Sequence, residues 1–333
     1  PSLFPSIFKE RLFNFWDCSF PLTDCNCTQV TEFSLIGFAD DPVIRVTLFL
    51  MFLLIYLVTI LGNLGIIILI RTSPQLHSPM YYFLGNLAFA DLCFSTVITP
   101  KMLADFLSEE KSVAYAGCIA QVLIFDIFGI TECFLLAAMA YDRYVAICHP
   151  LVYSIVMSPR LCFRLVTGSY LVGLMNSMGH TMGILNLSFC GSNVIDLFFC
   201  DISLLISLST SDTTLNRIIL TTSANVYGVS SSIVVLLSYL AILSTILRIR
   251  SVKGKRKAFS TCASHLSLVS IFYGTSLFIY LKPNSENSRG EDKWAVVLYT
   301  VVTPMLNPLI YRKRLVLCPD CLNHVPCYVS VPI

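Results

Sequence analysis

The chain alternates between long apolar runs and short polar segments. Seven of the runs are long enough to cross about 30 Å of hydrocarbon as a helix, which takes roughly 20 residues. A count of six or eight would need one run to break or a further run to exist after Tyr311, and the sequence has neither. The pattern therefore predicts an all-α membrane protein, a bundle of seven transmembrane helices. The runs lie at about 43–70, 79–103, 118–147, 161–185, 217–247, 258–281 and 294–311.

Composition and charge support this interpretation and orient the bundle. The chain is 56% hydrophobic and 13% charged, with a mean hydropathy of +0.75, whereas soluble domains usually carry about 25% charged residues. With the amino terminus outside, the cytoplasmic segments hold 13 of the 22 basic residues but only two acids. Because basic residues accumulate in cytoplasmic loops, this predicts an extracellular amino terminus and a cytoplasmic carboxyl terminus.

The spans divide the chain into three parts. Residues 1–42 form an extracellular segment, 43–311 the seven-helix domain and 312–333 a cytoplasmic tail. The first thirty residues have no apolar core followed by small residues, so we expect no cleavable signal peptide. The first span would then act as an uncleaved targeting signal. The chain begins with Pro rather than Met, which we interpret as processing, truncation or a gene-model fragment.

Enzyme signatures are missing from the sequence. It contains no P-loop, no nucleophile elbow and no paired-His zinc motif, and seven helices with short loops leave little room for a catalytic domain. The basic cluster at 253–257 lies between two spans, so we interpret it as a cytoplasmic anchor and protein contact. We therefore expect no enzymatic activity, no cofactor, no metal and no nucleic-acid partner.

Polar residues inside the apolar runs are candidates for function. An Asp at the centre of a membrane helix costs about 2.5–3.5 kcal/mol on insertion scales. Asp91 lies midway along the second run, Asn63 lies deep in the first, and Asn307 precedes Pro308 in the seventh. Their matching depth suggests one hydrated polar network at the bundle centre. Three unrelated hydrogen bonds between helices are the alternative.

Several motifs fall at fixed places relative to the runs. They are "GN" at 62–63, "LHSPMYYFLGNLAFADLC" at 76–93, "MAYDRYVAICHPLVY" at 139–153, "SY" at 238–239, "KAFSTCASHL" at 257–266 and "PMLNPLIY" at 304–311. This ordered set resembles the motifs of vertebrate olfactory receptors, a family of rhodopsin-like (family A) G-protein-coupled receptors. The strings "MAYDRYVAIC" and "KAFSTCASHL" separate that family from other rhodopsin-like receptors.

The resemblance implies a function and a location. A small hydrophobic odorant would bind within the helix bundle, and a stimulatory, olfactory-type heterotrimeric G protein would raise cyclic AMP. The location implied is the plasma membrane of olfactory sensory neuron cilia. One alternative is a non-signalling product of a degenerate receptor gene, because the tail 312–333 lacks the family's usual amphipathic helix. A seven-helix transporter is the other, but we find no inverted repeat or paired broken helices.

The resemblance also assigns a cytoplasmic switch. In similar receptors the Asp of the pair Asp142-Arg143 holds the Arg at rest, and activation frees the Arg to meet the G protein. Arg143 would lie at the end of the third span, where its side chain reaches water. A simple helix-end anchor is the alternative. The residues assigned to coupling are Asp142, Arg143, Tyr144, Asn307, Pro308 and Tyr311.

We expect the ligand pocket beside the third span. Asp126 lies eight residues after Cys118, about two turns or 12 Å along the helix. An ionised Asp at that depth needs a basic odorant, a polar neighbour or a raised pKa. Alternatively, Asp126 turns toward the second helix or the outer loop and is only hydrogen-bonded. The candidate pocket residues, taken from helical spacing and the resemblance, are Phe125, Asp126, Gly129, Ile130, Cys133 and Tyr273.

The outer cysteines and one sequon complete the assignments. The resemblance implies a disulfide between Cys118 and Cys200; free thiols are the alternative. Family members usually bridge a second loop cysteine, matching Cys190, to a position that is Thr210 here, so we expect Cys190 to carry a free thiol. Asn26 begins the sequon Asn-Cys-Thr at the family's usual glycosylation site, so we expect a glycan there.

Overall fold

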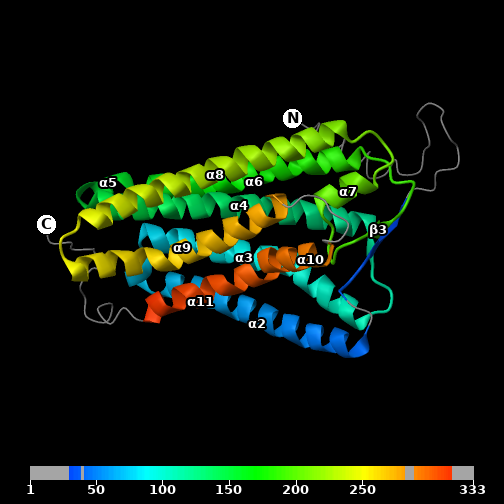
Figure 1. The fold of residues 1–333 in the computed structure, drawn as a ribbon, viewed down its shortest axis with the longest axis horizontal. Coiled ribbons are helices and arrows are strands. Elements are labelled where there is room, and N and C mark those ends of the chain that lie inside the picture. The colour runs from blue at the N-terminus through cyan, green and yellow to red at the C-terminus, as the bar shows by residue number, and fades with distance from the viewer. Residues whose placement is uncertain (1–29, 39–40, 282–288, 317–333) are drawn as a thin grey trace.

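The computed structural model describes residues 30–38, 41–281 and 289–316. Long helices lie side by side in one bundle (Figure 1). The first six are α2 (Pro42–Thr72), α3 (Pro79–Leu107), α4 (Tyr115–Cys148), α6 (Pro159–Leu185), α8 (Thr214–Arg248) and α9 (Val252–Leu281). The seventh consists of α10 (Arg289–Val297), a π-helical turn (Leu298–Val302) and α11 (Thr303–Val316). Short helices η1 (Pro74–Leu76), η2 (Pro150–Val152), α5 (Tyr153–Val156) and α7 (Ile202–Leu208) lie in the connections.

Five of the described helices are long and apolar enough to cross a membrane by length and composition. They are α2, α3, α4, α8 and the segment Lys293–Tyr311. The other two predicted spans form α6 and α9, which are 27 and 30 residues long. In α6 the polar residues Ser169, Asn176, Ser177 and His180 are all buried inside the protein. Each predicted run therefore forms a long helical segment of the bundle.

Proline and capping residues set where the helices begin. The Asp41 Oδ1 atom accepts hydrogen bonds from the amide nitrogens of Val43 and Ile44 at 2.8 and 3.1 Å, and Pro42 occupies the first turn, where it loses no helical hydrogen bond. Helix α6 begins in the same way, with Pro159 in the first turn and the side chain of Ser158 as cap.

A small sheet closes one end of the bundle, which we call the sheet end (Figure 1, right). Strand β1 (Glu32–Leu35) is central; it pairs antiparallel with β2 (Ser112–Ala114) and parallel with β3 (Val194–Ile195). Phe33 and Leu35 of β1 are 0% and 3% exposed. Phe33 and Leu35, which come before the first helix, are therefore packed into the fold.

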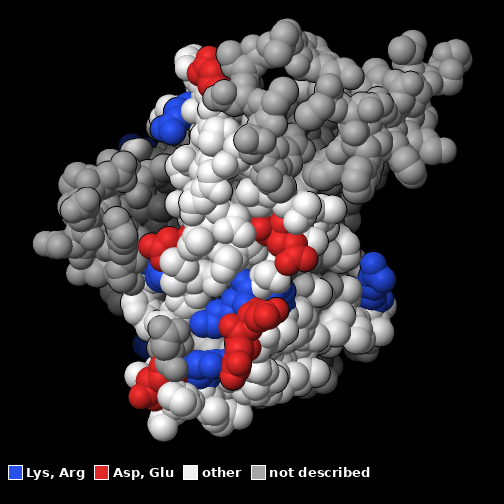
Figure 2. Space-filling view, turned by 90° about the vertical axis from the view of Figure 1, so that its right-hand side faces the viewer, with Lys and Arg blue, Asp and Glu red and all other residues white. Residues whose placement is uncertain are grey.

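Several contacts fasten the loops of the sheet end to the helices. Figure 2 shows acidic and basic side chains lying next to one another on this end. Lys293 of α10 pairs with Asp196 at 2.7 Å. The Gln121 Oε1 atom of α4 accepts a hydrogen bond from the Cys200 amide at 2.8 Å. The predicted disulfide between Cys118 and Cys200 is confirmed, and it ties this loop to the start of α4.

The prediction of a free thiol at Cys190 is wrong. Cys190 is disulfide-bonded, and none of the other described cysteines is its partner. The prediction considered only the missing cysteine at Thr210. The segment that leads into β1 reaches the same loop, since the Val30 amide donates to the Phe189 carbonyl at 3.1 Å. The loop that carries Cys190 is therefore joined to a part of the chain distant in sequence.

Helix α4 runs through the centre of the bundle and packs closely against α6. At Gly173 of α6 an added Cβ would lie 2.5 Å from the backbone oxygen of Ile127 and 2.9 Å from Thr131 Oγ1. The two backbones therefore meet where only glycine fits. Gly168, on the same helix, has no atom within 4 Å of the corresponding position.

We expect Gly173→Ala to destabilise the protein by about 1–3 kcal/mol, because overpacking forces α4 and α6 apart. Gly168→Ala is the matched control and should be neutral or slightly stabilising, since alanine favours helix by up to about 1 kcal/mol. Thermal unfolding of the purified variants measures the difference. Equal unfolding midpoints would show that the close approach of α4 and α6 has no energetic weight.

Candidate switch and ligand sites

The charge pair of the third span lies at the end of the bundle opposite the sheet. Arg143 Nη2 lies 2.9 Å from Asp142 Oδ2. The side chains of Arg143 and Asp142 are 13% and 0% exposed, so little water screens their attraction. The pair is closed in this structure.

Tyr153 of α5, which the sequence reasoning did not single out, also holds Asp142. Its hydroxyl donates to Asp142 Oδ1 at 2.8 Å. Burial and the negative charge of Asp142 raise the pKa of Tyr153, so the phenol stays protonated and able to donate. Both oxygens of Asp142 are thus occupied, one by Arg143 and one by the connection after α4. Tyr153 ends the quoted motif string, which was the available signal.

The other candidate switch residues divide between two places. The Tyr144 hydroxyl lies 3.0 Å from His149 Nε2, at the same end as Arg143. Tyr311 is 2% exposed and belongs to the hydrophobic core. Pro308 packs on α2 so closely that a Cβ on Gly62 would lie 2.7 Å from its ring. Gly62 of the "GN" motif therefore gives α11 room to approach.

The three polar residues of the predicted network meet at α11, which carries Asn307 and is contacted by Asn63 and Asp91. Asn307 Nδ2 donates to Asp91 Oδ2 at 2.5 Å. Asn63 Nδ2 donates to the carbonyl of Pro304 at 3.1 Å and to that of Thr59 at 3.0 Å. Asp91 and Asn307 are therefore joined directly, whereas Asn63 reaches the same helix through its backbone.

Glu132 of α4 lies beside Asp91 and was missing from the predicted network. It is 3% exposed, and its carboxyl group interacts with that of Asp91. Two carboxyl groups this close in a buried site repel each other when both are ionised. The sequence did contain a signal for including Glu132 in the network, because Glu132 is an acid inside an apolar run, one position before Cys133.

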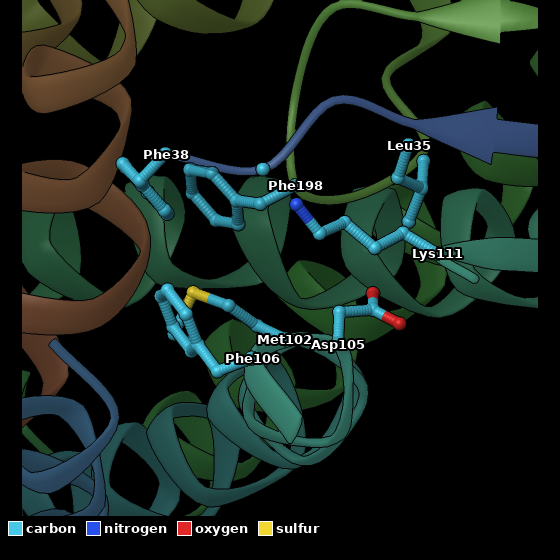
Figure 3. Close-up of a pocket in the computed structure, with 8 residues that line it drawn as sticks. Leu35, Phe38, Met102, Asp105, Phe106, Lys111 and Phe198 are labelled. Carbon is cyan, nitrogen blue, oxygen red and sulfur yellow. The ribbon is translucent and has the colours of Figure 1, made fainter. Parts of the chain in front are cut away.

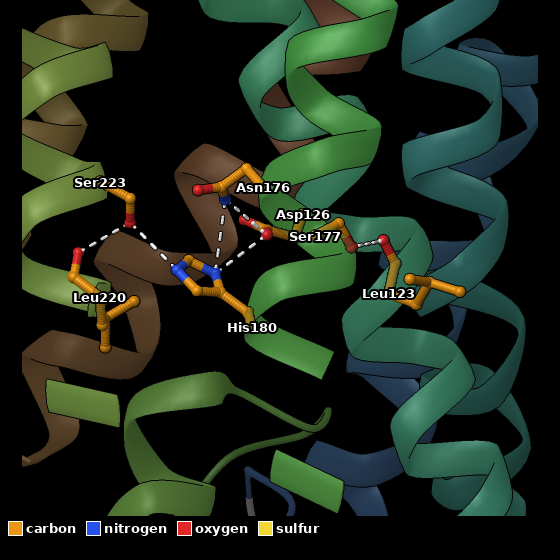
Figure 4. Close-up of polar contacts among 7 residues, drawn as sticks. All are labelled: Leu123, Asp126, Asn176, Ser177, His180, Leu220 and Ser223. Atoms are coloured by element: carbon orange, nitrogen blue, oxygen red, sulfur yellow. Dashed lines mark hydrogen bonds and ion pairs between the residues drawn. The ribbon is translucent and has the colours of Figure 1, made fainter. Parts of the chain in front are cut away.

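Asp126 points from α4 toward α6 and α8, away from α3 (Figure 4). Its Oδ2 atom lies 3.0 Å from His180 Nδ1 and accepts a hydrogen bond from Asn176 Nδ2 at 2.8 Å. His180 Nε2 lies 3.0 Å from Ser223 Oγ of α8. Asp126 thus has polar neighbours supplied by the protein, and the cluster joins three helices.

Asn176 and His180 are the ligand-site residues that the sequence reasoning missed. They are four positions apart in the fourth apolar run, so both lie on one face of α6. His180 also lines a small hollow between α6, α7 and α8 that opens to the outside. Polar side chains at helical spacing within an apolar run were the available signal.

The remaining candidate pocket residues occupy other faces of α4. The Phe125 ring lies 4.7 Å from that of Phe94 and 5.3 Å from that of Phe199. An added Cβ on Gly129 would lie 3.4 Å from the Tyr299 hydroxyl. Phe125 and Gly129 therefore face α3 and the π-helical turn. They point away from the polar cluster that Asp126 forms with Asn176 and His180. Ile130 is half-buried.

Comparison with known proteins decides what the bundle is. The sequence model of the olfactory receptor family matches residues 52–327. The chain is 52% identical over 293 residues to mouse olfactory receptor 5G9, covering 88% of this chain and 93% of the relative. It is 53% identical over the same length and coverage to human olfactory receptor 5D18. The chain belongs to the olfactory receptor family.

Two further comparisons agree with this assignment. The chain is 52% identical over 300 residues to the chicken olfactory receptor-like protein COR4, covering 90% of this chain and 96% of the relative. The crystal structure of squid rhodopsin matches with a TM-score of 0.63 at 18% identity, over 89% of this chain and 82% of that one. That likeness confirms the predicted seven-transmembrane fold of family A receptors.

Family membership fixes the broad function. This olfactory receptor is a multi-pass membrane protein and a signalling receptor rather than an enzyme, so the transporter alternative is wrong. As a G-protein-coupled receptor it has a small molecule as ligand and a G protein as partner.

In this olfactory receptor α8 and α9 are joined near the switch, at the "SY" and "KAFSTCASHL" motifs. The Tyr239 hydroxyl lies 2.6 Å from His265 Nδ1, and the two rings stack. Tyr273, on the same helix as His265, donates to the Cys133 carbonyl of α4 at 3.4 Å. Any outward movement of α9 must therefore change these contacts.

Proposed function

We propose that this olfactory receptor binds a small hydrophobic odorant within its bundle and activates a stimulatory, olfactory-type heterotrimeric G protein, which raises cyclic AMP. The observation that carries the proposal is the closed contact of Asp142 with both Arg143 and Tyr153 at one end of α4. The same helix carries the polar cluster around Asp126 nearer its other end. One helix therefore connects a ligand site with a coupling site.

The charge distribution supports an orientation with the sheet end outside. Basic residues concentrate in the segments at the Arg143 end, and such an excess marks the cytoplasmic side. Residues 1–42 are then extracellular, residues 43–311 form the membrane-spanning domain and residues 312–333 are cytoplasmic. The membrane in question is the plasma membrane of the cilia of olfactory sensory neurons. The proposed glycosylation site Asn26 lies outside the described residues.

Asp126 is the proposed centre of ligand recognition. Its side chain is 14% exposed and lies beside His180, which in turn lines the hollow between α6, α7 and α8. An odorant with a donor group can replace one of the bonds that His180 and Asn176 make to the carboxylate. Ile130 of α4 and Tyr273 of α9 would supply apolar contacts around it, whereas Phe125 and Gly129 face α3 and the π-helical turn instead. Amines and hydrogen-bond donors should therefore outrank aldehydes and esters.

The proposed switch works by releasing Arg143. In the resting receptor Asp142 holds Arg143, and Tyr153 holds Asp142. A ligand that favours the active state shifts the population toward a form in which Arg143 meets the G protein. Asn307, Pro308 and Tyr311 of α11 would respond together, since Asn307 is bonded to Asp91 in the bundle core. Tyr144, the next residue along α4, would move with Arg143.

We expect Tyr153→Phe to raise basal cyclic AMP. The hydroxyl of Tyr153 donates to a charged acceptor, and such bonds contribute about 1.5–3 kcal/mol. Without this bond the equilibrium between the resting and the active receptor should shift about tenfold toward the active form. Tyr82→Phe is the matched control, because Tyr82 is 40% exposed on α3. Cyclic AMP measured without odorant, at equal surface expression, should rise only for Tyr153→Phe; no rise would contradict a restraining role for this bond.

An odorant panel tests the proposed function as a whole. Cells that carry the full chain on their surface should raise cyclic AMP in response to some of the odorants. The contrary result is a receptor that reaches the surface and responds to no odorant, with a Tyr153→Phe variant whose basal cyclic AMP is unchanged. That result would support the alternative that the chain is a non-signalling product of a degenerate gene.

A further inference from the structure

Cations at the sheet end have acidic neighbours. Lys293 pairs with Asp196 at 2.7 Å. Lys101 pairs with Asp105, and Figure 3 shows Lys111 beside the same carboxyl group. The charges of this end are therefore largely compensated within the protein.

The connection between α8 and α9 differs, because it is strongly basic and has no acid near it. It lies at the end of the bundle opposite the sheet (Figure 1). No acid lies between Asp212 and Glu286, so neither α8 nor α9 carries a counter-charge. We call residues 248–257 the basic turn, and such an excess of positive charge attracts a multiply charged anion. Its six basic residues are Arg248, Arg250, Lys253, Lys255, Arg256 and Lys257.

The basic turn is compact, which brings its cations together. Only three residues separate the end of α8 from the start of α9. The Gly254 amide donates to Ser251 Oγ at 3.3 Å, and the Lys255 amide donates to the Ser251 carbonyl at 3.0 Å. These bonds turn the chain directly into α9, so Arg250 lies next to the first turn of that helix.

The described cations of the basic turn are available to a ligand. Arg248, Arg250 and Arg256 are exposed, and Lys255 is half-buried. None of these four side chains has a hydrogen bond or ion pair within the part of the chain that the structure describes. Phosphate groups suit them, because the planar fork of an arginine binds a phosphate through two parallel hydrogen bonds.

Apolar side chains flank the cations on α9. Val252 is 80% exposed and Phe259 is 60% exposed. Val252, Arg256 and Phe259 are spaced four and three positions apart, so they lie on one outward face of the helix. The arginine of this face is thus enclosed by two large apolar side chains.

Helix α8 has a similar outward face. Leu240, Leu243 and Leu247 are exposed at spacings of three and four positions, and the exposed Arg248 follows them. Because α8 is long and apolar enough to cross a membrane, this stripe faces acyl chains and Arg248 lies at its headgroup end. Cations that continue a lipid-facing stripe favour a lipid over a soluble protein as the partner.

We propose that the basic turn binds a phospholipid whose headgroup carries several phosphate groups, a phosphoinositide. The phosphates pair with Arg248, Arg250 and Arg256, while Val252 and Phe259 lie against the acyl chains. The inference rests on the proposed orientation, which places this end on the cytoplasmic side, where the anionic lipids of the plasma membrane are concentrated. It adds a lipid partner to the odorant and the G protein.

Binding of fluorescently labelled phosphatidylinositol bisphosphate to the purified full-length receptor in detergent micelles tests the site without any signalling readout. Wild-type receptor should bind this lipid much more tightly than labelled phosphatidylcholine of the same chain length. Arg250→Gln combined with Arg256→Gln should weaken binding roughly thirtyfold, because each basic residue beside an anionic lipid contributes about fivefold. Val252→Ser combined with Phe259→Ser should weaken binding of the lipid but not of soluble inositol trisphosphate.

Arg160→Gln combined with Arg164→Gln is the matched control. It removes two exposed arginines from α6 at the same end of the bundle, and it should leave the affinity for the lipid unchanged. Equal weakening by the two double arginine variants would show that only the overall charge of this end matters, which would overturn the site.

Three further results would overturn the proposal. The first, which needs no variant, is that wild-type receptor binds the two lipids equally. The second is that soluble inositol trisphosphate binds as tightly as the lipid. The third is that Arg250→Gln with Arg256→Gln keeps the lipid affinity but loses nucleotide exchange on the G protein, which would assign the basic turn to the G protein. Selective lipid binding by a receptor that activates no G protein would support this site and contradict only the proposed function.

Discussion

Arg143→Ala is expected to reach the cell surface in normal amounts and to give less than about a tenth of the wild-type odorant response. The side chain lies at the end of α4 and is bonded to Asp142 alone among the described contacts. Its removal should therefore spare the packing of the bundle while deleting the proposed contact with the G protein. A loss of roughly 1.4 kcal/mol in that contact already lowers coupling tenfold.

The measurement is odorant-evoked cyclic AMP, normalised to surface expression. Arg160→Ala is the matched control, because Arg160 is an exposed arginine at the same end of the molecule, in the first turn of α6. It should signal as the wild type does. Normal signalling by Arg143→Ala at the surface would remove Arg143 from the coupling mechanism.

The second large effect is expected at Asp126 and His180, in opposite directions. Asp126→Asn should weaken responses to amine odorants about tenfold, since a hydrogen bond or ion pair to a charged group contributes about 1.5–3 kcal/mol. His180→Asn should strengthen them, because His180 occupies the carboxylate that the amine needs, 3.0 Å from Asp126 Oδ2. Aldehydes and esters serve as internal controls and should change little in either variant.

Concentration–response curves for a panel of amines measure both changes. If wild type and Asp126→Asn responded equally across the amines, Asp126 would be only a structural residue that ties α4 to α6. If Asp126→Asn weakened the amines but His180→Asn did so equally, His180 would hold the carboxylate in place instead of competing for it. Opposite shifts separate recognition from simple loss of structure.

Most of the fold follows from the sequence because membrane helices have a strong local signature. An apolar run of about 20 residues must satisfy its backbone within the run, so the runs at 43–70 and 118–147 predicted α2 and α4 closely. Pro42 fixes where α2 begins, and Pro159 fixes where α6 begins. The sheet had no such signature, since its strands are four residues or fewer.

The sites were harder to predict because their partners lie far apart in sequence. Asp126 was visible as a charge in an apolar run, but its bond to His180 spans 54 positions. Apolar packing such as that at Gly173 leaves no polar signal at all, although it sets the distance between α4 and α6.

Nucleotide exchange on a purified stimulatory G-protein α subunit, catalysed by this receptor in lipid nanodiscs, tests the central claim most directly. It needs no knowledge of the odorant, because Tyr153→Phe weakens the hold on Asp142 and should activate the receptor by itself. The account predicts that Tyr153→Phe accelerates exchange severalfold over wild type and that adding Arg143→Ala removes the acceleration. Two results would contradict the account. One is that folded Tyr153→Phe receptor leaves nucleotide exchange at the rate measured without receptor. The other is that the variant carrying both Tyr153→Phe and Arg143→Ala accelerates exchange as much as Tyr153→Phe alone.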